Sequence, residues 1–135
     1  MEKEKGLDFL RKANALIQPK PKVLTAISQE KATILNALHR YREAIVEHKK
    51  SYTLSQNPKY LFYMASIYHE QLENKAEALK YYELFLDKLP PEKATTNENE
   101  NKGITINLQK LAKEKVTELR EELFFEGKIK TNNAP

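Results

Sequence analysis

The sequence predicts an all-α protein, and three observations lead to this prediction. Apolar residues recur three and four positions apart over most of the chain, which is the spacing of one face of an α-helix. Prolines stand between these periodic segments rather than inside them, where they would break a helix. The 135 residues include only three glycines and no tryptophan, and 31% are charged, a composition typical of helical proteins. A chain of this length fits one domain, expected over residues 1–127.

The first expected helix covers residues 4–17. Pro19 and Pro21 follow it, and proline ends a helix because it lacks the amide hydrogen for the next bond and restricts the residue before it. A second helix is expected over residues 22–38, where Lys31 interrupts the buried side. The apolar faces are expected to consist of Leu7, Leu10, Ala13 and Leu16 or Ile17 in the first helix, and of Leu24, Ile27, Ile34, Leu35 and Leu38 in the second.

Three further helices with the same spacing of apolar residues follow. One begins at Tyr41 and ends before Pro58, and the next begins at Lys59, since proline is favourable at the start of a helix. The fifth covers residues 75–89 and is closed by Pro90. The helix that begins at Lys59 has the clearest amphipathic pattern in the chain, with Leu61, Met64, Ala65, Tyr68 and Leu72 on one face.

The C-terminal part combines a polar segment with one more helix. Residues 92–103 contain almost no apolar side chain and are expected to form a flexible loop. The helical spacing resumes over residues 104–126, and Gly127 is expected to stop this last helix. Residues 128–135 are expected to form a disordered tail.

A shift of 34 residues superposes one half of the central pattern on the other. The superposed pairs are Ile27 and Leu61, Ile34 and Tyr68, Leu38 and Leu72, Ala44 and Ala78, Ile45 and Leu79, and His48 and Tyr82. Two short helices cannot bury their own apolar faces and must stack on a neighbour. The repeat therefore predicts stacked helical hairpins.

These residues resemble the tetratricopeptide repeat family, whose signature has a small residue and an aromatic in the first helix and alanine, an aromatic and proline in the second. Ala65, Tyr68, Ala78, Tyr82 and Pro90 match this signature. The earlier copy departs from it and has Lys31, Ile34, His48 and Ser51 at the corresponding places. The resemblance implies a right-handed solenoid of about six helices.

The resemblance also divides the chain. It implies one repeat at 22–56 and another at 58–91, with 4–17 as the second half of a preceding repeat and 104–126 as a C-terminal capping helix, as in some bacterial repeat proteins. Two and a half repeats leave the first helix without a partner for its apolar face. Either a longer solenoid precedes the chain, or Leu7, Leu10 and Ile17 contact a second copy in a homodimer.

The family's mode of action implies a protein-interaction scaffold or adaptor that needs no cofactor. In such solenoids the first helix of each repeat lines a concave groove that holds a peptide or a partner protein, with an aromatic anchor and polar groups for register. Carried onto this sequence, the groove residues are Ser28, Leu35, Asn36, Phe62, Ser66, His69 and Glu70, with Phe62 as the anchor.

Two other functions stay open. The repeats could serve as a structural assembly segment of a larger complex or of a longer repeat protein. The net charge of +4 would also suit a weak nucleic-acid binder, although 23 basic residues are interleaved with 19 acidic ones along almost every segment. Nucleic acid is therefore an unfavoured partner.

The sequence does not predict an enzyme or a metal site. The chain has no cysteine, and the zinc-protease pattern His-Glu-x-x-His is incomplete because Glu73 stands where the second histidine after His69 is needed. Nucleophile elbows and phosphate-binding glycine loops are absent.

The start of the chain is charged and does not resemble a secretion signal. No apolar run approaches the roughly 18 residues that a membrane span needs. These features predict a chain that is not inserted into a membrane and favour the cytoplasm, while a place in the cell envelope would require a signal outside this chain.

Overall fold

The structure is a computed structural model that describes residues 5–8, 20–90 and 99–127, with the backbone alone for residues 99–106. All regular elements in these ranges are α-helices, which confirms the predicted fold class. A single helical turn at 5–8 is followed by α2 (Pro21–Ala37), α3 (Tyr41–Ser55), α4 (Lys59–Glu70), α5 (Lys75–Lys88) and α6 (Asn99–Phe125).

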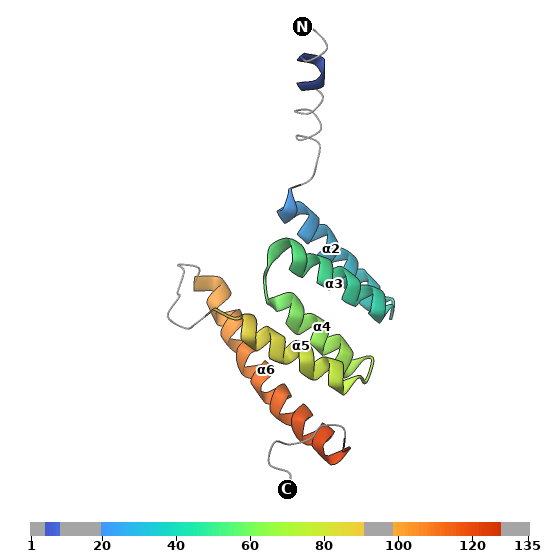
Figure 1. The fold of residues 1–135 in the computed structure, drawn as a ribbon, viewed down its shortest axis with the longest axis vertical. Coiled ribbons are helices and arrows are strands. Elements are labelled where there is room, and N and C mark those ends of the chain that lie inside the picture. The colour runs from blue at the N-terminus through green and yellow to red at the C-terminus, as the bar shows by residue number, and fades with distance from the viewer. Residues whose placement is uncertain (1–4, 9–19, 91–98, 128–135) are drawn as a thin grey trace.

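The helices pack in chain order. Helix α2 contacts α3, α3 contacts α4, α4 contacts α5, and α6 packs mainly on α5 with a smaller contact to α4 (Figure 1). Within the described residues α2 has one helical neighbour, α3, whereas α4 has packed neighbours on both sides. This difference decides which side chains of the two helices are buried.

Short turns reverse the chain between consecutive helices. His39, Gln56 and Glu73 have φ angles of 61°, 57° and 52°, so the turns after α2, α3 and α4 each use the left-handed conformation. Asn74 then caps α5, because its side chain accepts a hydrogen bond of 3.2 Å from the backbone amide of Glu77. Gly127 follows α6 with a φ of 71°, which confirms the predicted end of the last helix.

The core lies where α3, α4, α5 and α6 meet. Phe62 is buried in it, and its ring centroid lies 5.4 Å from that of Tyr82 and 5.5 Å from that of Phe85. Ala44 and Ala78 are both fully buried, as their shared place in the 34-residue register predicts. The other buried apolar residues of this cluster are Ile45, Leu61, Met64, Ala65, Ile67, Ala112, Val116 and Leu119.

The prediction for the buried side of α2 is wrong in part. Ile27, Ile34 and Leu38 are 45%, 52% and 59% exposed, and the residues that α2 buries are the small Ser28 and Ala32. The prediction assumed a helix on each side of α2, as α4 has. Because only α3 packs on α2 in the described residues, the face on the far side stays open to solvent.

The start of α6 also differs from the prediction. The helix begins at Asn99, inside the segment expected as a loop, and continues through Gly103. Residues 99–103 contain no proline, and a single glycine costs a helix only about 1 kcal/mol, which a long helix tolerates. The rest of the expected loop, residues 91–98, and the expected tail, residues 128–135, lie outside the described residues.

The expected N-terminal helix is described only at residues 5–8, which are helical and exposed. Leu7 is among them, whereas Leu10 and Ile17, the other residues of the expected self-association surface, lie outside the described residues. In the parts of the chain that the structure describes, none of the helices has the length and apolar character that crossing a membrane requires.

Candidate functional site

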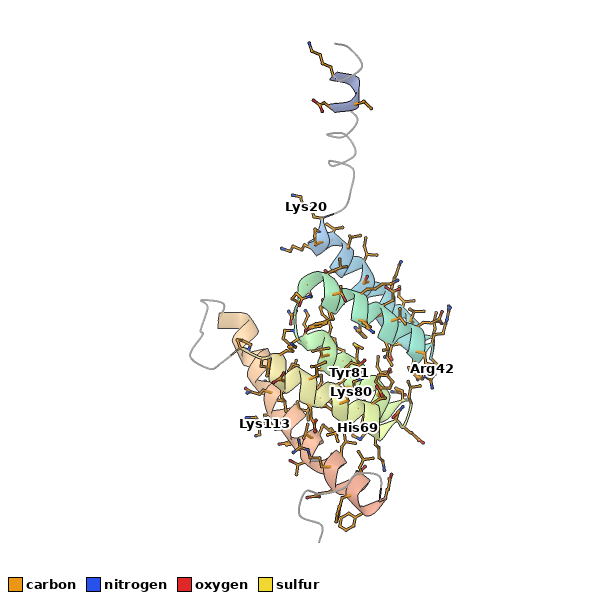
Figure 2. All side chains as sticks on the ribbon, in the orientation of Figure 1. Lys20, Arg42, His69, Lys80, Tyr81 and Lys113 are labelled. Atoms are coloured by element: carbon orange, nitrogen blue, oxygen red, sulfur yellow. The ribbon has the colours of Figure 1, made fainter. Side chains whose placement is uncertain are left out.

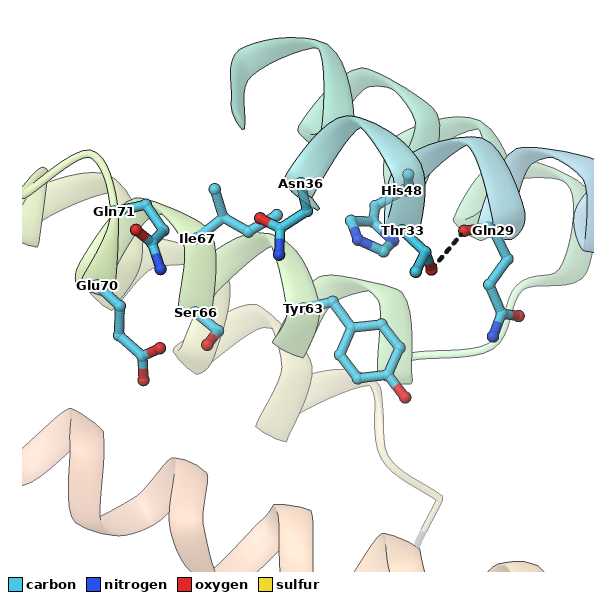
Figure 3. A pocket seen from close by; sticks show the side chains of 10 residues that line it. Gln29, Thr33, Asn36, His48, Tyr63, Ser66, Ile67, Glu70 and Gln71 are labelled. Atoms are coloured by element: carbon cyan, nitrogen blue, oxygen red, sulfur yellow. Dashed lines mark hydrogen bonds between the residues drawn. The ribbon is translucent and has the colours of Figure 1, made fainter. Parts of the chain in front are cut away.

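A pocket of about 360 Å³ lies between α2 and α4, and its floor includes one residue of α3. Figure 3 shows side chains of α2 and of α4 projecting into this space. We call it the α2–α4 pocket. Its lining consists of Gln29, Ala32, Thr33, Asn36, His48, Tyr63, Ser66, Ile67, Glu70 and Gln71.

The lining from α2 and α4 follows the 34-residue register. Four pairs of lining residues are 34 positions apart: Gln29 and Tyr63, Ala32 and Ser66, Thr33 and Ile67, and Asn36 and Glu70. Equivalent positions of the two helices therefore face the same space. The register that predicts the packing of the hairpins also defines one continuous surface across them.

Uncharged groups that both donate and accept hydrogen bonds dominate the pocket. Gln29, Asn36 and Gln71 contribute carboxamides, each with two donors and an acceptor oxygen. The Thr33 hydroxyl donates to the backbone carbonyl of Gln29 at 3.0 Å, which keeps its oxygen free to accept (Figure 3). Glu70 is the only carboxylate in the lining. This chemistry matches the amide and carbonyl groups of a polypeptide main chain.

One hydrogen bond joins the two helices beside the pocket: the Tyr60 hydroxyl on α4 donates to the side-chain oxygen of Gln29 on α2 at 2.9 Å. Behind the pocket, burial raises the pKa of the Tyr82 hydroxyl to about 12, and the Ser66 side chain opposes this rise. Tyr82 is therefore neutral at physiological pH.

His48 lies on the floor of the pocket. It comes from α3, is only 8% exposed, and its ring centroid is 5.5 Å from that of Tyr63. Burial lowers the pKa of His48 below its usual value of 6.5, because a charged imidazole is poorly solvated there. Its Nδ1 atom is buried without a hydrogen-bond partner among the described residues. The imidazole is therefore neutral and contributes an apolar ring face to the floor.

This buried histidine predicts a pH-dependent stability. The folded-state pKa of His48 is lower than that of the unfolded chain, so the unfolded state takes up a proton first as the pH falls. The stability is fully present above about pH 6.5 and declines below it. We expect the midpoint of thermal unfolding to fall between about pH 7.5 and about pH 5.5, and His48→Gln to reduce this fall. The control His39→Gln changes an exposed histidine and should keep the wild-type slope; equal slopes for the two variants would contradict the prediction.

The structure brings together only some of the residues predicted for the groove. Asn36, Ser66 and Glu70 line the α2–α4 pocket. Ser28 is buried on the α3 side of α2, and Leu35 is half-buried against the core. His69 instead lines a separate cavity of about 670 Å³ near the C-terminal end of α6.

Phe62, the predicted anchor, does not line the pocket, because its ring is inserted between Tyr82 and Phe85. The aromatic residue on the pocket is its neighbour Tyr63. One residue corresponds to about 100° around a helix, so a register error of a single position moves a side chain from the groove into the core. Gln29, Thr33 and Gln71 were missed for the same reason: the prediction placed Ser28 and Phe62, not Gln29 and Tyr63, on the groove.

The charges of the described surface are spread over the molecule. Lys20, Arg42 and Lys113 lie far apart on different elements in Figure 2. Several cations are paired with acidic neighbours: Arg120 contacts Glu83 at 2.9 Å, and Lys75 contacts Glu122 at 3.2 Å. Among the described residues, no group of three or more histidine, aspartate or glutamate side chains is arranged to hold a metal ion.

Comparisons with protein-family models, with curated protein sequences and with solved structures found no match for this chain.

Proposed function

We propose that this protein is an interaction scaffold whose two helical hairpins form a tetratricopeptide-like solenoid and hold an extended segment of a partner protein in the α2–α4 pocket. The observation that carries the proposal is the lining itself. Four pairs of residues related by the 34-residue register face one space from α2 and α4. A repeat that brings equivalent positions to one surface is the arrangement by which stacked hairpins build an extended binding face.

The chemistry of the lining supports a polypeptide as the ligand. Carboxamides such as Asn36 and Gln71 can donate to main-chain carbonyl groups and accept from main-chain amides of an extended segment. Tyr63 provides an aromatic wall and Ile67 an apolar one, which would hold an uncharged side chain of the partner. Glu70, the only carboxylate of the lining, would favour a lysine or arginine beside that side chain.

A phage-displayed library of random dodecapeptides tests this proposal. Peptides enriched on the wild-type protein should bind Asn36→Ala and Glu70→Lys at least about tenfold more weakly, a loss of about 1.4 kcal/mol, when measured as labelled synthetic peptides by fluorescence anisotropy. Both side chains are exposed, so the helical circular dichroism should not change.

The matched control is Thr53→Ala, a substitution of an exposed polar residue on α3 that does not line the pocket. It should bind the enriched peptides as the wild type does. The proposal fails if no peptide is enriched, or if the enriched peptides bind the pocket variants and the control with equal affinity.

A further inference from the structure

The floor of the α2–α4 pocket holds a polar ring without a partner. His48 is 8% exposed, and among the described residues no hydrogen bond involves either nitrogen of its imidazole. Nδ1 is buried, whereas Nε2 is not one of the fully buried polar atoms that lack a partner. Because the ring lines the pocket, Nε2 is the nitrogen that a bound molecule can reach (Figure 3).

The surroundings of the two ring nitrogens decide which of them carries the proton. A neutral imidazole has one N–H donor and one acceptor nitrogen. Buried N–H groups without a partner are rarer in proteins than buried acceptors without one, and no described residue accepts a hydrogen bond from Nδ1 of His48. Solvent in the open pocket can accept from Nε2. The proton is therefore expected on Nε2, which presents an N–H donor to the pocket beside the apolar face of the ring.

Two hydrogen-bond acceptors lie at the same end of the pocket. The ring centroid of His48 is 5.5 Å from that of Tyr63 and 6.2 Å from that of Tyr60. The Tyr60 hydroxyl donates to the side-chain oxygen of Gln29, which keeps a second lone pair. The Thr33 hydroxyl donates to a backbone carbonyl, so its oxygen can also accept. We call this part of the pocket, with one donor and two acceptors, the His48 end.

Charged side chains do not fit the His48 end. The residues that line the pocket include no lysine or arginine, so a carboxylate would be buried there without a cation. An ammonium or guanidinium group carries donors alone, and these would face the N–H of His48. Glu70, the carboxylate of the lining, follows Tyr63 by seven positions and so lies about 10 Å further along α4. The chemistry of the His48 end therefore favours an uncharged group.

We propose, on the basis of the function proposed above, that the partner segment inserts an asparagine or glutamine side chain into the His48 end of the pocket. The carbonyl oxygen of this carboxamide accepts from the Nε2–H group of His48. Its NH2 group donates to the side-chain oxygens of Gln29 and Thr33. A carboxamide is the side-chain group that offers an uncharged acceptor and two donors together. The pocket of about 360 Å³ has room for one such side chain.

Matched peptides test the proposal on the unaltered protein. The enriched dodecapeptides should share an asparagine or a glutamine. Its replacement by the isosteric aspartate or glutamate, or by leucine, should weaken binding at least about tenfold in fluorescence anisotropy. Alanine at a position that varies among the enriched sequences is the control, and it should change the affinity by less than about threefold.

Substitutions of His48 test the protein side of the same contact. His48→Leu removes the donor and keeps an apolar side chain at the buried position, so the enriched peptides should bind at least about tenfold more weakly. His48→Gln restores an N–H donor on a side chain of similar length and should bind within about threefold of the wild type. His39→Gln, at an exposed histidine outside the pocket, is the control and should not change binding. Unchanged helical circular dichroism separates these effects from loss of folding.

The position of the imidazole proton gives a test that needs no peptide. Long-range ¹H–¹⁵N NMR correlations of the free protein distinguish the ring nitrogen that carries the proton from the one that does not. At about pH 7.5, above the usual pKa of histidine, Nε2 of His48 should be protonated and Nδ1 should not. A proton on Nδ1 would overturn the proposal.

The binding experiments can also overturn it, in ways that differ from a failure of the proposed function. Peptides that depend on Asn36 and Glu70 but share no asparagine or glutamine would leave the proposed function standing and remove the carboxamide. Equal affinity of wild type and His48→Leu for the enriched peptides would have the same meaning. A library that yields no enriched peptide would contradict both proposals.

Discussion

Phe62→Ala is expected to lower the free energy of unfolding by about 3–5 kcal/mol, the usual cost of removing a buried aromatic ring from a core. Phe62 is buried and its ring is in edge contact with Tyr82 and Phe85 on α5. Removing it leaves a cavity between α4 and α5 and ends both aromatic contacts. Urea denaturation followed by the helical circular dichroism signal measures the change in the free energy of unfolding.

The matched control is Phe125→Ala, the same substitution at a side chain that is 84% exposed. It should leave the unfolding midpoint nearly unchanged, within about 0.5 kcal/mol. A Phe62→Ala protein as stable as this control would mean that Phe62 is not a core residue. That result would also restore it as a candidate for the groove.

Leu119→Ala is expected to cost about 2–5 kcal/mol. Leu119 is fully buried where α6 packs on the α4–α5 hairpin, in a cluster that also contains Ala112 and Val116. The prediction treats α6 as an integral part of the core. Thermal or urea unfolding of the full chain measures the loss, and a two-state transition should be retained.

Leu111→Ala provides the comparison on the same helix, because Leu111 is exposed. Its effect should stay within about 0.5 kcal/mol of the wild type. If both leucine variants were equally stable, α6 would not be packed on α5 as described, and the capping role inferred for it from the sequence would lose its support.

Much of the fold is predictable from the sequence because the residues that begin and end the helices act locally. Proline can begin or end a helix through its own backbone, and Gly127 ends α6 through a φ that other residues adopt at a cost. The 34-residue register correctly pairs Ala44 with Ala78 as buried residues. The residues that end helices act within a few positions, and the register is visible because it repeats along the chain.

Burial on α2 could not be predicted in the same way. Ile27 and Ile34 have the spacing of a core face, but whether they are buried depends on a neighbour that the local pattern does not specify. The start of α6 is a similar case, since Asn99 and its polar successors carry no apolar period and are helical all the same.

The sequence predicts some of the residues that line the candidate site correctly and places its aromatic residue one position away. Asn36, Ser66 and Glu70 line the pocket, but the aromatic position was placed at Phe62 instead of Tyr63. Both residues are aromatic, and the choice between them depends on the rotation of α4 about its axis. That rotation is fixed by packing against α3 and α5, which a single sequence does not reveal.

The stacking order of the helices has a mechanical consequence for the pocket. Helices α2 and α4 make no direct backbone packing with each other; both pack on α3, and the hydrogen bond from the Tyr60 hydroxyl to Gln29 joins them beside the pocket. We therefore expect the packing of α3 on α4, together with this hydrogen bond, to set the distance between the two walls. Substitutions at the contact between α3 and α4 should change the width of the pocket while every residue that lines it stays the same.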